Sequence, residues 1–200
     1  MERVKKYKVV PVVVINEIAE TEPKMQALCD GGLPIAEITF RTACAKEAIA
    51  LAIEKFPQML IGAGTVINKK QAEEAVALGV KFIVGPGYQK EVSLYCKEKG
   101  VPYFPGCVTP TEIISALEDG IEIIKFFPAN VYGGLTAMKS LAGPFPQVTF
   151  IPTGGVDAKN LAEYLAWDKI HAIGGSWMMK GSDADIVAHC KEIAKIVEGK

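Results

Sequence analysis

The chain has 200 residues, half of them hydrophobic, and a formal net charge of −1, values that suit one sizeable core rather than two domains. It carries no block of like charge, so we expect no nucleic acid and no membrane surface as partner. No apolar run approaches the roughly 20 residues of a membrane helix, and the N-terminus lacks the pattern of a signal peptide.

Short apolar runs recur along the chain at regular intervals. Segments of helical period separate them, and several begin with strong capping signals, such as Thr109-Pro-Thr-Glu112, Ser182-Asp-Ala-Asp185 and Asn68-Lys-Lys-Gln71. Glycines close several of these helices, as at Gly31 and Gly79. The predicted strands begin near Val9, Ile35, Met59, Phe82, Tyr103, Glu122, Val148 and Ile170.

Eight such units without a linker predict an α/β fold, a parallel eight-stranded (β/α)8 TIM barrel with a short N-terminal helix. The barrel is expected to form a single domain over residues 1–200. A doubly wound open sheet is the alternative. Against it, no Gly-x-Gly-x-x-Gly turn follows the first strand, where such folds usually hold a nucleotide.

The sixth predicted strand, within Glu122–Ala129, carries a lysine in its middle. With the strand period of two, Lys125 shares a face with Ile123 and Phe127. A buried ammonium is costly, and losing its proton would leave an amine that attacks carbonyls. A lysine at a strand end that reaches solvent is the alternative explanation.

The second predicted strand places Glu37, Thr39 and Arg41 on one face. A carboxylate, a hydroxyl and a guanidinium would make a poor core, and chemistry in these barrels collects at the carboxyl ends of the strands. If this face pointed outward instead, Ile38 and Phe40 would have to fill the interior. We therefore expect the polar face to point inward.

Glycine-rich segments stand at the ends of the third, seventh and eighth predicted strands. Gly62-Ala-Gly-Thr65 would let a ligand approach the backbone, although a tight turn explains it equally well. Pro152-Thr-Gly-Gly155 and Gly174-Gly-Ser-Trp177 follow strands seven and eight, where barrels bind phosphate with exposed N–H groups and a helix N-terminus. His171 and His189 are expected to be structural, and Glu118, Asp119 and Glu122 to be solvated.

The five cysteines are scattered, without the spacing of a disulfide framework or a zinc site. We expect no metal and a reducing, cytoplasmic location. Whether the thiol of Cys107 is reactive stays open.

Together these motifs resemble one known family, the 2-keto-3-deoxy-6-phosphogluconate (KDPG) aldolases, often bifunctional as 4-hydroxy-2-oxoglutarate aldolases. The resemblance covers essentially the whole chain and implies a homotrimeric class I aldolase on a (β/α)8 barrel, without metal or other cofactor. The motifs that carry it are Glu37-Ile-Thr-Phe-Arg41, Gly62-Ala-Gly-Thr-Val66, Lys125-Phe-Phe-Pro-Ala129, Gly143-Pro-Phe145, Pro152-Thr-Gly-Gly155 and Ile173-Gly-Gly-Ser-Trp177.

Carried over by position, the resemblance implies that Lys125 forms the Schiff base with the pyruvate portion and that Glu37 moves protons as general acid and base. Arg41 and Thr65 would hold the pyruvate carboxylate and its neighbouring oxygens. The other substrate-binding residues would be Pro86, Phe127 and Thr153, and the phosphate-binding residues Gly154, Gly155, Gly174, Gly175 and Ser176.

The implied reaction is cleavage of KDPG to pyruvate and glyceraldehyde 3-phosphate, and of 4-hydroxy-2-oxoglutarate to pyruvate and glyoxylate. Val14 stands where galactonate-specific relatives often carry arginine, which favours the gluconate substrate modestly. Three alternatives stay open: a phosphogalactonate aldolase, a phosphate-binding barrel isomerase with Glu37 as base, and a non-catalytic binding protein.

Overall fold

In a computed structural model, which describes residues 2–199, eight parallel strands alternate with helices. Every predicted strand is confirmed, and the largest shift is at the eighth, which begins at Ile173 instead of Ile170. Met1 and Lys200, the ends of the predicted domain, lie outside the described residues. The strands are β1 (Val9–Val13), β2 (Ile35–Thr39), β3 (Leu60–Gly64), β4 (Ile83–Val84), β5 (Tyr103–Phe104), β6 (Ile123–Phe126), β7 (Thr149–Pro152) and β8 (Ile173–Gly175).

The strands form a curled six-stranded sheet in the order β5-β4-β3-β2-β1-β8 and a two-stranded sheet of β6 and β7. Isolated parallel bridges join Gly106 to Lys125 and Thr153 to Gly174, so each end of the small sheet meets an end of the larger one. The order does not reverse beside β1, as it does in a doubly wound sheet. That alternative is therefore wrong.

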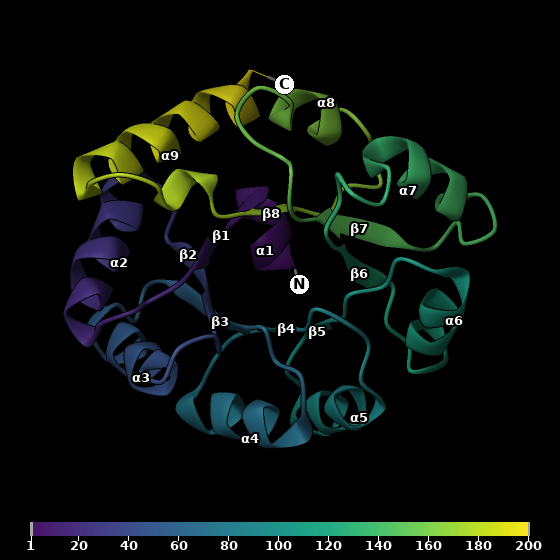
Figure 1. The fold of residues 1–200 in the computed structure, drawn as a ribbon, viewed down its shortest axis with the longest axis horizontal. Helices are drawn as coiled ribbons and strands as arrows, with labels where there is room; N and C mark the ends of the chain where they lie inside the picture. The colour runs from purple at the N-terminus through teal and green to yellow at the C-terminus, as the bar shows by residue number, and fades with distance from the viewer. Residues whose placement is uncertain (1, 200) are drawn as a thin grey trace.

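The helices form an outer ring around the strands (Figure 1), and α1, seen at the centre of that view, confirms the predicted short N-terminal helix. They are α1 (Glu2–Tyr7), α2 (Thr21–Asp30), α3 (Ala45–Lys55), α4 (Lys69–Leu78), α5 (Lys90–Lys99), α6 (Pro110–Glu118), α7 (Gly134–Ala142), α8 (Leu161–Leu165) and α9 (Asp183–Glu198). Two short 3-10 helices, η1 (Ile18–Glu20) and η2 (Trp177–Met179), precede α2 and α9.

The helix boundaries follow the capping signals of the sequence. Thr109 begins α6 and Ser182 begins α9, each in a complete capping box. Gly79 ends α4 in the left-handed conformation, as expected. Gly31 ends α2 with φ −77°, so its lack of a side chain has another reason: a Cβ there would lie 2.4 Å from that of Cys190 on α9.

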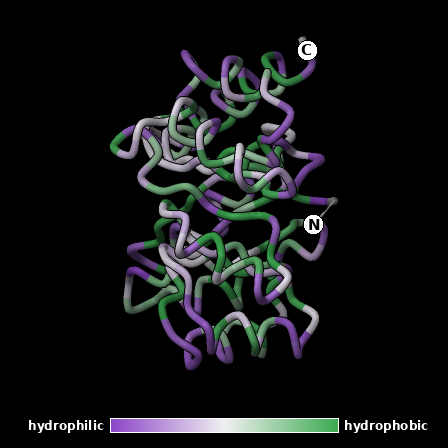
Figure 2. The backbone as a smooth tube through the Cα atoms, turned by 90° about the vertical axis from the view of Figure 1, so that its right-hand side faces the viewer, coloured by the Kyte–Doolittle hydropathy of each residue, from purple (hydrophilic) through white to green (hydrophobic). Residues whose placement is uncertain are grey.

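The buried core lies between strands and helices and inside the curled sheet. Figure 2 shows hydrophobic segments through the middle of the molecule and hydrophilic segments mostly at its outer turns. Among its largest fully buried side chains are Phe82, Phe104, Phe126 and Phe150. Among the described residues, no helix is long and apolar enough to cross a membrane.

Candidate active site

Lys125 is buried in the interior of the curled sheet, with 3% of its surface exposed. It belongs to β6, where its backbone N–H donates to the carbonyl of Pro105 and its own carbonyl accepts from Cys107. The alternative of a lysine that reaches solvent is therefore wrong.

The carboxylate of Glu37 lies next to this amine. Its Oε1 is 3.4 Å from Nζ of Lys125, and both side chains are almost fully buried. Glu37 sits in β2, between Val12 of β1 and Gly62 of β3. The polar face of the second strand thus points inward, as predicted.

Gly64 in β3 makes this position of Glu37 possible. A Cβ at residue 64 would lie 2.2 Å from Oε1 of Glu37. Gly62 plays the same part for Phe82, whose ring would lie 2.3 Å from a Cβ. The small residues of β3 therefore make room for neighbouring side chains, whereas the sequence left a ligand or a tight turn as explanations.

Phe127, just after β6, lies between the buried pair and a cavity. The centroid of its ring lies 5.2 Å from Nζ of Lys125, and the same side chain lines a cavity of about 290 Å³. An ammonium near a ring face is favoured modestly, and the apolar ring shields one side of the amine from water.

Arg41 lines the same cavity, and Thr65 lies next to it. Nε of Arg41 donates a hydrogen bond of 2.9 Å to Oγ1 of Thr65. Thr65 has φ 57°, a left-handed conformation that costs a β-branched residue free energy and that occurs mostly where function demands it. The remaining guanidinium nitrogens of Arg41 are suited to a carboxylate.

The cavity collects most of the predicted binding residues from the carboxyl ends of four strands, β2, β6, β7 and β8. It is lined by Val12, Arg41, Phe127, Thr153, Gly154, Gly155, Val156, Asp157, Gly175, Ser176, Trp177 and Lys180. Gly154 and Gly155 have φ 88° and 82°, which only glycine adopts readily, so the turn that follows β7 depends on them.

Some predicted residues lie outside this lining. Lys125 and Glu37 are not in the lining, but the ring of Phe127, which is, lies beside Nζ of Lys125. Thr65 is also outside the lining and is hydrogen-bonded to Arg41, which lines the cavity. Gly174 is buried in β8, where a Cβ would lie 2.3 Å from Oγ1 of Thr153. Pro86 is exposed, and its carbonyl packs against Gly106, the partner of Lys125 in an isolated bridge.

Five residues of the cavity lining were not predicted from the sequence: Val12, Val156, Asp157, Trp177 and Lys180. The ring of Trp177 covers Gly175 and also lines the cavity. Asp157 and Lys180 add one negative and one positive charge. The only signal for Lys180 was its place a few residues after the second Gly-Gly pair.

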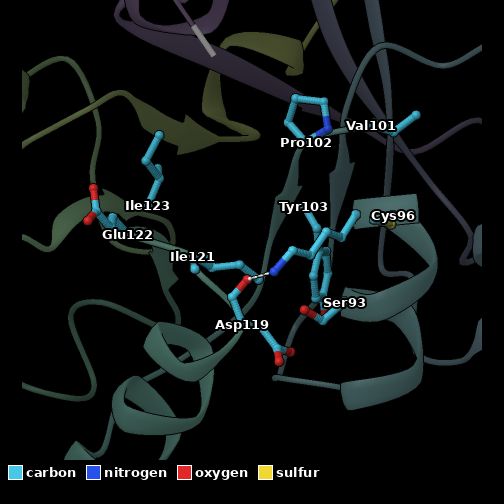
Figure 3. A pocket seen from close by; sticks show the side chains of 11 residues that line it. Ser93, Cys96, Val101, Pro102, Tyr103, Asp119, Ile121, Glu122 and Ile123 are labelled. Carbon is cyan, nitrogen blue, oxygen red and sulfur yellow. Dashed lines mark hydrogen bonds between the residues drawn. The ribbon is translucent and has the colours of Figure 1, made fainter. Parts of the chain in front are cut away.

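A second cavity, of about 420 Å³, lies at the opposite ends of the strands, between α5 and the segments that precede β5 and β6 (Figure 3). No predicted site residue lines it. Asp119, expected to be solvated, is 6% exposed there. Its carboxylate accepts hydrogen bonds from Tyr88, at 2.6 Å, and from Lys90, while Nζ of Lys97 donates to its carbonyl.

Cys107 is fully buried, and burial raises the pKa of its thiol to about 12. The thiolate is the reactive form of cysteine. We therefore expect the thiol of Cys107 to be unreactive in the folded protein.

The chain is similar to known proteins over most of its length. Residues 1–196 match the family model "Aldolase: KDPG and KHG aldolase". A 2-dehydro-3-deoxy-phosphogluconate aldolase of Treponema pallidum is 44% identical over 178 residues, which cover 89% of this chain and 85% of the relative.

Two solved structures are also similar. The 2-keto-3-deoxy-6-phosphogluconate aldolase of Zymomonas mobilis with 3-phosphoglycerate has a TM-score of 0.92 at 37% identity and covers 98% of this chain and 95% of that one. The KDPG aldolase of Legionella pneumophila, with pyruvate captured as a covalent carbinolamine intermediate, has a TM-score of 0.85 at 38% identity and covers 96% and 93%. This chain therefore belongs to the KDPG and KHG aldolase family, whose members are carbon–carbon lyases.

Proposed function

We propose that this protein is a class I aldolase that cleaves KDPG to pyruvate and glyceraldehyde 3-phosphate, and 4-hydroxy-2-oxoglutarate to pyruvate and glyoxylate. The observation that carries this proposal is the buried pair of Lys125 and Glu37, with Nζ and Oε1 3.4 Å apart. An amine and a carboxylate in this position supply both a nucleophile and a proton carrier.

Lys125 is proposed as the nucleophile. Its amine adds to the keto carbon, and loss of water from the carbinolamine gives a protonated imine. The imine accepts the electron pair of the breaking carbon–carbon bond, the adjacent hydroxyl loses its proton, and the aldehyde leaves. The enamine that remains gains a proton at carbon, and water releases pyruvate and the free amine. The carbinolamine captured in the Legionella relative supports this chemistry.

Glu37 is proposed to move the protons, because it is the carboxylate beside the amine. Carbinolamine formation, dehydration, deprotonation of the hydroxyl and protonation of the enamine each need such a carrier. Phe127, whose ring lies beside the amine, would limit the access of water during these steps.

Arg41 and Thr65 are proposed to hold the pyruvate carboxylate, with Thr65 fixing the guanidinium through its hydroxyl. Thr153 and Phe127 would line the substrate, and Pro86 would border it from the loop after β4. The phosphate end would lie against the loops after β7 and β8, where Gly154, Gly155, Gly175 and Ser176 line the cavity. Gly174, buried in β8, would support this set from behind the lining.

We also propose that residues 1–200 form one domain and that its two sheets close into a single eight-stranded barrel. The isolated bridges at Gly106 and Thr153 support closure. The imine route needs no metal or other cofactor. A homotrimer and a cytoplasmic location stay predictions; exposed Val131 and Tyr132 offer apolar surface that a subunit interface could cover, and the mass in solution would test the trimer.

Borohydride reduction in the presence of pyruvate tests the central step. We expect a stable adduct on Lys125 by peptide mapping, and none in folded Lys125→Ala protein. Pyruvate release from KDPG, from the phosphogalactonate isomer and from 4-hydroxy-2-oxoglutarate then ranks the substrates. Absence of the adduct in folded wild-type protein would refute the imine-forming aldolase. Turnover of substrate by Lys125→Ala would do the same, and either result would favour an isomerase that uses Glu37 as base.

A further inference from the structure

The cavity between the loops after β7 and β8 has a lysine in its lining that the sequence did not predict. Lys180 lines it together with Gly154, Gly155 and Ser176. Its side chain is exposed, and among residues 2–199 it forms no ion pair. Its charge therefore remains available to an anion that enters the cavity.

The backbone around Lys180 is held on both sides. The N–H of Lys180 donates to the carbonyl of Trp177 and closes η2. Nδ1 of His189, on α9, lies 3.2 Å from the carbonyl oxygen of Met178 within the same turn. Two residues after Lys180, the capping box of Ser182 begins α9. Hydrogen bonds on both sides of Lys180 therefore hold its backbone in place, while its side chain is exposed.

The charges of the cavity make this lysine significant. The ionisable side chains in the lining are Arg41, Lys180 and Asp157. Arg41 is bonded to Thr65, in the position proposed for the pyruvate carboxylate. Asp157 opposes any anion in the cavity. A phosphate monoester carries about −1.5 to −2 charges at pH 7, so Lys180 is the cation left to balance it.

We propose that Lys180 is a specificity-determining residue: its ammonium binds the substrate phosphate and favours phosphorylated keto acids over non-phosphorylated ones. The inference rests on the proposed function and adds a charged side chain to a phosphate site otherwise built from backbone groups and Ser176. A lysine binds phosphate as a mobile point charge, which suits a side chain at the rim of a cavity.

Three variants test it. Lys180→Met removes the charge at similar length, Lys180→Arg keeps it, and Lys159→Met removes an exposed lysine from the segment after β7 that does not line the cavity. The first measurement is the ratio of kcat/KM for KDPG to kcat/KM for 4-hydroxy-2-oxoglutarate. The second is inhibition of 4-hydroxy-2-oxoglutarate cleavage by inorganic phosphate.

We expect Lys180→Met to lower the ratio about tenfold, mainly through KM for KDPG, and to weaken phosphate inhibition by a similar factor. Lys180→Arg should restore most of both, and Lys159→Met should change neither. An unchanged ratio in Lys180→Met, or an equal fall in Lys159→Met, would overturn the proposal. Pyruvate trapping on Lys125 separates the two hypotheses: if it persists while the ratio is unmoved, only the role of Lys180 fails, and if wild-type protein traps no pyruvate, the aldolase proposal fails first.

Discussion

Nζ of Lys125 and Oε1 of Glu37 lie 3.4 Å apart, although 88 residues separate them in the chain. Removing one partner of a buried pair usually leaves an uncompensated charge, at a cost of about 3–5 kcal/mol. A buried ionisable pair of this kind, beside the cavity that we propose binds the substrate, points to chemistry rather than to stability.

Glu37→Gln tests the carboxylate. The amide keeps the shape of the side chain but cannot carry protons, so we expect kcat to fall by about 10²–10⁴. Steady-state kinetics with KDPG measure the effect, and a thermal melt verifies that the variant is folded. A change in KM alone would show that Glu37 only binds substrate.

Gly64→Ala tests how Glu37 is positioned. The new methyl group would overlap the Glu37 carboxylate. We therefore expect kcat to fall, and the free energy of unfolding to fall by about 1–3 kcal/mol because the site is overpacked. Gly62→Ala is the matched control on the same strand, because its methyl group meets Phe82 instead. Both variants should have a lower melting temperature than wild type, and kcat per folded molecule should fall only in Gly64→Ala. Equal losses of kcat would refute the positioning role.

Asp119→Asn tests the buried carboxylate at the other end of the strands. Burial by itself would raise the pKa of Asp119, but hydrogen bonds from Lys90, Ser93 and Tyr88 outweigh it and hold the pKa below its usual value. The folded state therefore binds this proton more weakly than the unfolded state. The resulting stabilisation is complete above about pH 4, the unfolded pKa, and is lost as pH falls through the lower folded pKa.

At pH 7 we expect Asp119→Asn to lose about 1.5 kcal/mol of unfolding free energy, and the difference from wild type to shrink below pH 4. Urea titrations at several pH values provide the measurement. Glu122→Gln, at an exposed carboxylate nearby, is the control and should leave the free energy of unfolding at pH 7 unchanged. A constant difference between wild type and Asp119→Asn would argue against a stabilising ionised form.

Cys107 should resist thiol reagents in the native protein. With its pKa near 12, about one thiol in ten thousand is ionised at pH 8. Maleimide labelling followed by peptide mapping should modify the partly exposed Cys44 well before Cys107. In denaturant both should react at similar rates. Rapid native labelling of Cys107 would mean that the β5–α6 segment opens.

Much of this fold could be predicted because its signals are local. Apolar runs marked each strand, and Thr109 and Ser182 marked the starts of two helices. The strand period of two showed which residues share a face with Glu37 and Lys125, and the polar residues beside Glu37 indicated that its face points inward.

What escaped prediction depends on contacts between distant segments. Asp119 looked like a solvated helix-end residue because its partners, Tyr88 and Lys90, belong to another unit of the chain. Lys180 could not be assigned to the cavity until the turn of η2 was known. For Gly64 the sequence left a ligand or a tight turn as explanations, whereas the group that needs the space is the Glu37 carboxylate of β2.

Positions 37 and 64 share one volume, since the carboxylate of the first occupies the space that a side chain on the second would need. A library that varies either position alone would sample mostly overlaps or voids. Varied together, the two positions allow exchanges of size, such as a shorter acid at 37 with alanine at 64, which would draw the carboxylate back from Lys125. Redesign of this interior for another substrate should therefore treat the two residues as one unit.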